Sequence, residues 1–198
     1  MLYMAHYAIM KKNNLSGISK TTVDKHTIIR YTEKLPENMH YRSVIQDNRS
    51  GDIVCIAPSK SVEFKEDMYD NIMAEAFIEG TMINLFWNEQ DWQIATRSCV
   101  GGNNHFYNDA PTFRQMFLEA LPDAFNFEAL PRVSENNLPF VYSFVLQHVD
   151  NRIVAPVIEN KVYLVELFEK NPQLLEINKN SDPYEGHKLS FKKDSILK

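Results

Sequence analysis

Hydrophobic and polar residues alternate along much of the middle of the chain, which is the pattern of half-buried β-strands. Two pairs of such runs are separated by short turn-rich segments, so each pair predicts a hairpin. The four runs are, in chain order, Arg42–Gln46, Ile53–Ala57, Thr81–Trp87 and Trp92–Arg97. Two further β-rich runs follow at Phe140–Gln147 and Val162–Phe168. The chain is therefore expected to be rich in antiparallel sheet.

Helical periodicity is confined to fewer segments. In Thr112–Leu121, Phe113, Met116 and Phe117 lie at spacings of three and four, which predicts one apolar stripe along a helix. Thr112 follows a proline and is a candidate N-cap. A second helix is expected over Glu66–Ala76, whereas the first 35 residues are ambiguous. Antiparallel strands with a few helices indicate an α+β fold.

The faces of the predicted strands differ in character. In Phe140–Gln147, Ser143, Val145 and Gln147 share one face, opposite an apolar face. Met82, Asn84 and Phe86 share a face of Thr81–Trp87 in the same way, and Arg97 is expected on the face of Trp92–Arg97 that carries Gln93 and Ala95. Such a sheet has one face in the core and one lining a cleft, or one face in water.

Composition narrows the protein class. The 198 residues are enough for one domain, and 44% hydrophobic with 24% charged residues is an ordinary soluble balance. The net charge of −5 argues against a general nucleic-acid coat protein but not against a local basic groove. Cys55 and Cys99 match no metal-ligand spacing, and no metal site is predicted. We expect reduced structural thiols in a soluble, intracellular protein without a membrane segment.

Several short motifs occur in a defined order. They are Arg42 at the start of a strand, Pro58 and Lys60 before Phe64, Phe77-Ile78-Glu79-Gly80-Thr81, Ile94-Ala95-Thr96-Arg97-Ser98, and a strand leading into Asn151-Arg152-Ile153-Val154. This order resembles the nucleotidyltransferase domain of phage-type RNA ligases. That domain belongs to a superfamily of covalent nucleotidyltransferases with DNA ligases and mRNA capping enzymes. The resemblance covers roughly residues 40–168, and the order of the motifs carries more weight than any one of them.

The resemblance implies a fold, ligands and site residues. The fold would be a nucleotidyltransferase (ATP-grasp-like ligase) domain over residues 1–177, with antiparallel sheets forming a cleft and flanking helices. A polar, lysine-rich tail would follow at 178–198. The implied ligands are ATP with Mg²⁺, and nucleotide or RNA ends. The implied binding residues are Arg42, Lys60, Arg97 and Arg152 for phosphate, and Glu79 for a ribose hydroxyl.

The chain departs from the family pattern at the catalytic positions. The family's motif lysine attacks the α-phosphate of ATP, and Phe77 stands in its place without a nucleophilic atom. The glutamate that the family carries on a later strand is replaced by Val145. The last motifs of the family are a Glu-Gly pair and a pair of lysines. They have only weak counterparts here, in Glu185-Gly186 and Lys192-Lys193. We therefore predict no catalytic residue, and a protein that binds nucleotide or RNA ends without adenylyl transfer.

Two alternatives stay open. The first is an active ligase that uses another lysine, of which Lys60 is the best placed. The second is a non-catalytic protein-interaction module that keeps only the fold. Each candidate residue also has an ordinary structural role, such as a strand end for Arg42 or a turn for Glu79. For His148 the default expectation is a hydrogen-bonded structural histidine, and for Gly101-Gly102 a turn.

Overall fold

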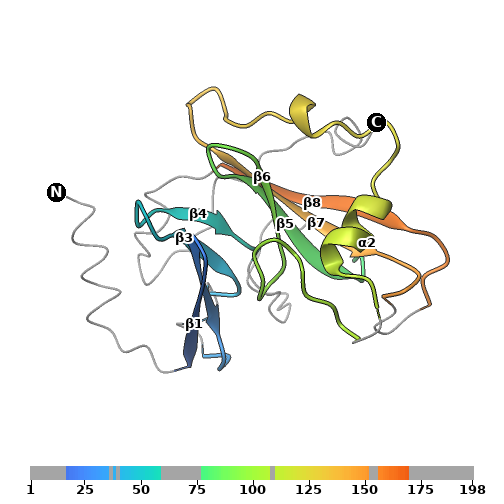
Figure 1. Cartoon of the computed structure of the whole chain (residues 1–198), viewed down its shortest axis with the longest axis horizontal. Coiled ribbons are helices and arrows are strands. Elements are labelled where there is room, and N and C mark those ends of the chain that lie inside the picture. The colour runs from blue at the N-terminus through green and yellow to red at the C-terminus, as the bar shows by residue number, and fades with distance from the viewer. Residues whose placement is uncertain are drawn as a thin grey trace, which may run out of the picture.

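The computed structural model describes residues 17–35, 38, 41–58, 77–107, 110–151 and 156–169. Within these residues the strands form two four-stranded antiparallel sheets, accompanied by one α-helix and a short 3-10 helix. Figure 1 shows the first sheet beside one end of the second, with the α-helix toward the other end. No helix in the described part of the chain is long and apolar enough to cross a membrane. The expectation of antiparallel sheets is confirmed.

The N-terminal sheet has the strand order β1-β2-β3-β4. Its strands are β1 (Ile18–Val23), β2 (His26–Tyr31), β3 (Val44–Asp47) and β4 (Ile53–Ile56). The hairpin of β3 and β4 was predicted, and Ile45 pairs with Cys55 within it. The hairpin of β1 and β2 was not predicted, because β1 is a largely exposed edge strand that carries no alternation of buried positions.

The C-terminal sheet has the strand order β6-β5-β7-β8. Its strands are β5 (Thr81–Trp87), β6 (Trp92–Ala95), β7 (Phe140–Gln147) and β8 (Lys161–Glu169). The predicted hairpin of β5 and β6 is confirmed by the pairing of Leu85 with Ile94. Strand β7 lies between β5 and β8 and pairs antiparallel with both.

Strand β6 ends two residues earlier than predicted. The side-chain hydroxyl of Thr96 accepts hydrogen bonds from the backbone N–H groups of Ser98 (3.4 Å) and Cys99 (3.1 Å). These local bonds form a turn that competes with continued strand pairing. Arg97 consequently lies in a loop, so the expectation that it shares a strand face with Gln93 and Ala95 was wrong.

The one described α-helix is α2 (Phe113–Glu119), as the apolar stripe predicted. Its N-cap is Thr112, whose hydroxyl accepts from the backbone N–H of Gln115 at 3.2 Å. The 3-10 helix η3 (Phe127–Ala129) follows. The helix expected over Glu66–Ala76 lies outside the described residues.

The two faces of the C-terminal sheet are buried against different partners. The helix face, which carries Phe140, Tyr142, Phe144 and Leu146 of β7, packs against α2 in a large apolar core. The other face, called here the inner face, places Phe86, Ala95 and Val141 against Ile45 and Cys55 of the N-terminal sheet. The inner face is therefore buried against the N-terminal sheet at this end, where the sequence left open a cleft or water. The alternation could not reveal this burial, because it does not say what covers a face.

Both cysteines are free. Cys55 is buried between the sheets, and its burial raises the pKa of its thiol. Cys99 is partly buried, and its thiol donates to the carbonyl oxygen of Val100 at 3.3 Å. Cys55 thus has the surroundings of an inert structural thiol.

Candidate functional site

Gly80 brings the start of β5 into close contact with β7. A Cβ atom at this position would lie 2.7 Å from Cγ1 of Val145 and closer still to the carbonyl oxygen of Leu146. Real Cβ atoms do not approach backbone this closely, so only glycine fits here without movement of the strands. The glycine of the Glu79-Gly80 pair therefore has a clear backbone role, and it lies directly beside Val145.

Phe77 precedes this contact and is exposed to solvent. Its side chain is 90% exposed, although phenylalanine is usually buried. The position that the ligase resemblance assigns to a nucleophile is therefore accessible but holds an apolar ring. A phenyl ring has no atom that can attack phosphate, so no covalent step can start at this residue.

A buried polar pair occupies the middle of the inner face. Asn84 and Ser143 are both fully buried, and the Ser143 hydroxyl donates to Oδ1 of Asn84 at 2.8 Å. The Nδ2 group of Asn84 has no hydrogen-bond partner. A buried donor without a partner costs about 1–3 kcal/mol of stability. The inner face thus changes from apolar at Val141 to polar two residues further along β7.

Arg97 connects the two sheets. One terminal nitrogen of its guanidinium donates to the carbonyl oxygen of Tyr31 at 3.1 Å, and Nε donates to the carbonyl oxygen of Arg42 at 3.4 Å. The guanidinium also lies 4.9 Å from the centre of the Tyr31 ring. Two of the predicted binding residues, Arg97 and Arg42, are therefore neighbours at the junction of the sheets, where Arg97 has a structural role and stays exposed.

The other predicted binding residues are distributed differently. Lys60 and Arg152 lie outside the described residues, as do Glu185-Gly186 and Lys192-Lys193. Glu79 is partly buried and directly precedes Gly80 and β5. Arg97 follows β6, whose last residue, Ala95, pairs with Asn84 of β5. Among the described candidates, Arg97 bonds to the backbone carbonyl of Arg42.

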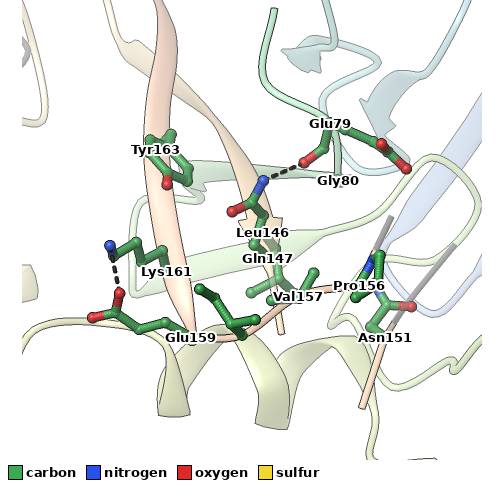
Figure 2. Close-up of a pocket in the computed structure, with 11 residues that line it drawn as sticks. Glu79, Gly80, Leu146, Gln147, Asn151, Pro156, Val157, Glu159, Lys161 and Tyr163 are labelled. Carbon is green, nitrogen blue, oxygen red and sulfur yellow. Dashed lines mark hydrogen bonds and ion pairs between the residues drawn. The ribbon is translucent and has the colours of Figure 1, made fainter. Parts of the chain in front are cut away.

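A cavity of about 270 Å³ lies where β5 begins, β7 ends and β8 begins. It is lined by Glu79, Gly80, Leu146, Gln147, Asn151, Pro156, Val157, Ile158, Glu159, Lys161 and Tyr163. Figure 2 shows the Gln147 amide directed at the backbone of Glu79, and Lys161 directed at Glu159. The corresponding distances are 2.8 Å from Gln147 Nε2 to the Glu79 carbonyl oxygen and 2.5 Å from Lys161 Nζ to Glu159 Oε2. The Glu159 carboxylate raises the pKa of Lys161 through this bond.

Asn151 is a buried polar residue in the cavity wall. Its side chain is 4% exposed, and Nδ2 donates to the hydroxyl of Thr81 at 2.8 Å. Oδ1 of Asn151 is buried and has no partner. This hydrogen bond to Thr81 links the segment after β7 to the first residue of β5, which directly follows Gly80.

His148 supports the turn that carries Asn151. Its Nδ1 accepts from the backbone N–H of Asp150 at 3.2 Å, and Nε2 lies 3.0 Å from the carboxylate of Glu119 on α2. Because Nδ1 accepts, Nε2 carries the proton in the neutral ring. The expectation of a hydrogen-bonded structural histidine is confirmed.

No metal site is evident in the described part of the chain. No group of three or more His, Cys, Asp or Glu side chains there could hold a metal ion. We therefore derive no chemical step through Mg²⁺.

Sequence reasoning did not select Gln147, Lys161 and Tyr163 as site residues. The alternation of β7 placed Gln147 on the same face as Ser143 and Val145, which was a usable signal. The register of β7 with β8 pairs Gln147 with Lys161 and Val145 with Tyr163, and this pairing is not visible in the sequence. The cavity could therefore be found only after the strands were paired.

Comparisons with known proteins add no family assignment. No family model matches the chain, and no curated protein matches it significantly. The ligase resemblance therefore rests on the order of the sequence motifs alone.

Proposed function

We propose that this chain is an RNA ligase-like protein that binds nucleotide or RNA ends and cannot form an adenylate on a motif lysine. The observation that carries the proposal is the contact between Gly80 and Val145. The resemblance assigns a nucleophile to the position of Phe77, shortly before Gly80, and a carboxylate to the position of Val145. This chain has neither group. Two losses at neighbouring positions are more typical of one degenerate site than of unrelated substitutions.

The surviving basic residues support weak binding. Arg42 and Arg97 lie together at the sheet junction, where the exposed Arg97 has donors available beyond its two carbonyl bonds. A charge-assisted bond to phosphate contributes about 1.5–3 kcal/mol. A few such bonds, less the entropy of immobilising a ligand, correspond to dissociation constants in roughly the micromolar to millimolar range.

The test is a calorimetric titration with ATP and with a short 5′-phosphorylated RNA. The parent chain should bind at least one of them, and the affinity should fall as the salt concentration rises. Arg97→Ala and Lys60→Ala should each weaken binding. Because Arg97 also holds the sheets together, the folded fraction of Arg97→Ala must be measured beside its binding.

Arg114→Ala is the matched control. Arg114 is an exposed arginine on α2, on the helix side of the C-terminal sheet. Its removal changes the net charge equally and should leave binding unchanged. If the parent binds neither ligand, or if Arg114→Ala weakens binding as much as Arg97→Ala, the ligase-like binding site is rejected.

A protein-interaction module is the second candidate. It is favoured by Phe77 and Ile158, which are 90% and 93% exposed and are the most exposed large apolar side chains in the described part of the chain. Failure of the titrations above, together with intact folding, would favour this candidate over RNA-end binding.

A further inference from the structure

Two adjacent aromatic side chains are exposed in the segment between β6 and α2. Phe106 is 55% exposed and Tyr107 is 51% exposed, although aromatic side chains are usually buried more deeply. Their ring centres lie 4.8 Å apart, and the two rings meet edge to face. Neither ring belongs to the apolar clusters of the described residues. The pair, called here the aromatic platform, therefore presents ring surface to solvent.

The segment before the platform is held in place from two sides. On the side of β6, the backbone N–H of Gly101 donates to the carbonyl oxygen of Ile94 at 2.7 Å. On the side of α2, the carbonyl oxygen of Asn104 accepts from the backbone N–H of Phe113 at 2.9 Å. Oδ1 of Asn104 also accepts from the hydroxyl of Thr96 at 3.1 Å. The platform thus follows a backbone that is already ordered, which lowers the entropy cost of binding a ligand there.

The hydrogen bond between Thr96 and Asn104 also limits the distance from the platform to Arg97. Arg97 directly follows Thr96, and Phe106 lies two residues after Asn104. With about 3.8 Å between consecutive Cα atoms, the Cα atoms of Arg97 and Phe106 are at most about 20 Å apart. Stacked nucleotides of one strand rise about 3.4 Å each, so about six nucleotides cover this distance. The exposed Arg97 therefore lies within reach of a short strand bound at the platform.

The side chains around the platform favour nucleic acid over an apolar protein surface. From Thr96 to Tyr107 the chain carries Arg97 and His105 and no Asp or Glu, whereas the whole chain has a net charge of −5. Asn103 and His105, which precede the platform, are exposed polar residues and not aliphatic ones. Surfaces that bind single strands combine aromatic rings, on which bases stack, with cations that meet the phosphates.

We propose that the aromatic platform of Phe106 and Tyr107 binds an unpaired base of single-stranded RNA, while Arg97 contacts a phosphate of the same strand. This inference rests on the proposed function and names single-stranded RNA as its ligand class. The base stacks on the face of one ring and meets the other ring at its edge. Bases inside a duplex are covered by their neighbours on both faces, so the platform selects unpaired strands.

The first experiment compares a single strand with a duplex. The probe is a 5′-phosphorylated RNA of about eight nucleotides, within the usual site size for single strands, with a fluorescent label at its 3′ end. Fluorescence anisotropy measures its binding to the full chain, alone and annealed to its complement. The single strand should bind at least about fivefold more tightly. The duplex carries more negative charge, so attraction by arginine alone would favour it, and equal or tighter duplex binding would contradict the proposal.

Variants separate stacking from charge. Phe106→Leu keeps an apolar side chain without the ring and should weaken single-strand binding at least about fivefold, with an unchanged dependence on salt. Arg97→Ala should reduce the slope of log affinity against log salt concentration by about 0.7. Phe106→Trp enlarges the ring and should bind at least as tightly as the parent, which partial unfolding cannot produce. Leu118→Ala is the control, because it removes a 42% exposed apolar side chain from α2 and should leave the affinity unchanged.

The outcomes distinguish this inference from the proposed function. If Phe106→Leu binds the single strand as the parent does while Arg97→Ala weakens binding, the platform is rejected and the proposed function stands. The same holds if the parent binds ATP but no RNA, or if Leu118→Ala weakens binding as much as Phe106→Leu. If the parent binds neither ligand, both proposals are rejected, and the exposed aromatic pair is assigned to a protein contact.

Discussion

The two faces of β7 carry different kinds of side chain. On the helix face, Phe140, Tyr142, Phe144 and Leu146 form a continuous apolar core with α2. On the inner face, Val141 is packed between the sheets, Ser143 is a buried polar residue, Val145 contacts Gly80, and Gln147 lines a cavity. The helix face thus buries apolar side chains along the whole length of β7. The inner face carries a buried polar pair and part of a cavity wall, which contribute less to stability. The buried polar pair and the contact of Val145 with Gly80 lie on the second face.

The largest loss of stability is expected from the helix face. Phe144 is fully buried and packs edge-on against Phe117 of α2 at a ring distance of 5.4 Å. Phe144→Ala should lower the free energy of unfolding by about 3–5 kcal/mol, through lost burial and the cavity left behind. Chemical denaturation measures this. Val145→Ala, one residue along on the inner face, should cost clearly less, and an equal cost would remove the distinction between the faces.

Gly80→Ala should have the next largest effect. The added methyl group would overlap the backbone of Leu146 and the side chain of Val145, so β5 must move away from β7. We expect a loss of about 2 kcal/mol in unfolding free energy, which is typical of overpacking. Gly51→Ala is the control, because Gly51 has a φ of +77° but no atom lies within 4 Å of the place that its Cβ would take. Gly51→Ala should lower the free energy of unfolding by only about 1 kcal/mol, because alanine must adopt a left-handed backbone conformation there. A smaller loss for Gly80→Ala than for Gly51→Ala would contradict the close approach.

The buried polar pair predicts a non-additive result. Ser143→Ala leaves Oδ1 of Asn84 without its donor and should cost about 1–3 kcal/mol. In the double variant Ser143→Ala with Asn84→Leu, both partners are removed together with the unpartnered Nδ2 of Asn84. The double variant should therefore be less destabilised than the sum of the single variants. Simple additivity in denaturation experiments would show that the two side chains are not coupled.

The smallest expected effect is a pH dependence from His26. This side chain is buried beside Phe86, and burial lowers its pKa below the usual 6.5, although Asp47 partly opposes the shift. Because the folded chain then binds the proton more weakly than the unfolded chain, stability is complete above pH 6.5 and is lost as the pH falls below it. His26→Phe should flatten this slope in denaturation midpoints measured on both sides of pH 6.5. An unchanged slope would assign the effect to another group.

The sequence predicted the strands of the C-terminal sheet well, because their residues alternate strongly. It also identified the N-cap at Thr112. It did not predict the end of β6, which depends on the side chain of Thr96 forming a local turn. Nor did it predict the cavity, since Gln147, Lys161 and Asn151 are brought together by strand register and by the bond to Thr81. Alternation reveals which residues share a face, but not what lies opposite that face.

In the proposed function, this chain binds nucleotide or RNA ends without forming a covalent adenylate. It is tested most directly by equilibrium dialysis against ATP labelled at the α-phosphate, with magnesium, followed by denaturation of the protein. We expect label to be bound to the native protein and to be completely released on denaturation, because Phe77 offers no amine for attack. Label that stays on the denatured chain, mapped to Lys60 or any other lysine, would contradict the proposed function, and so would the absence of label on the native protein if the chain also fails to bind the 5′-phosphorylated RNA.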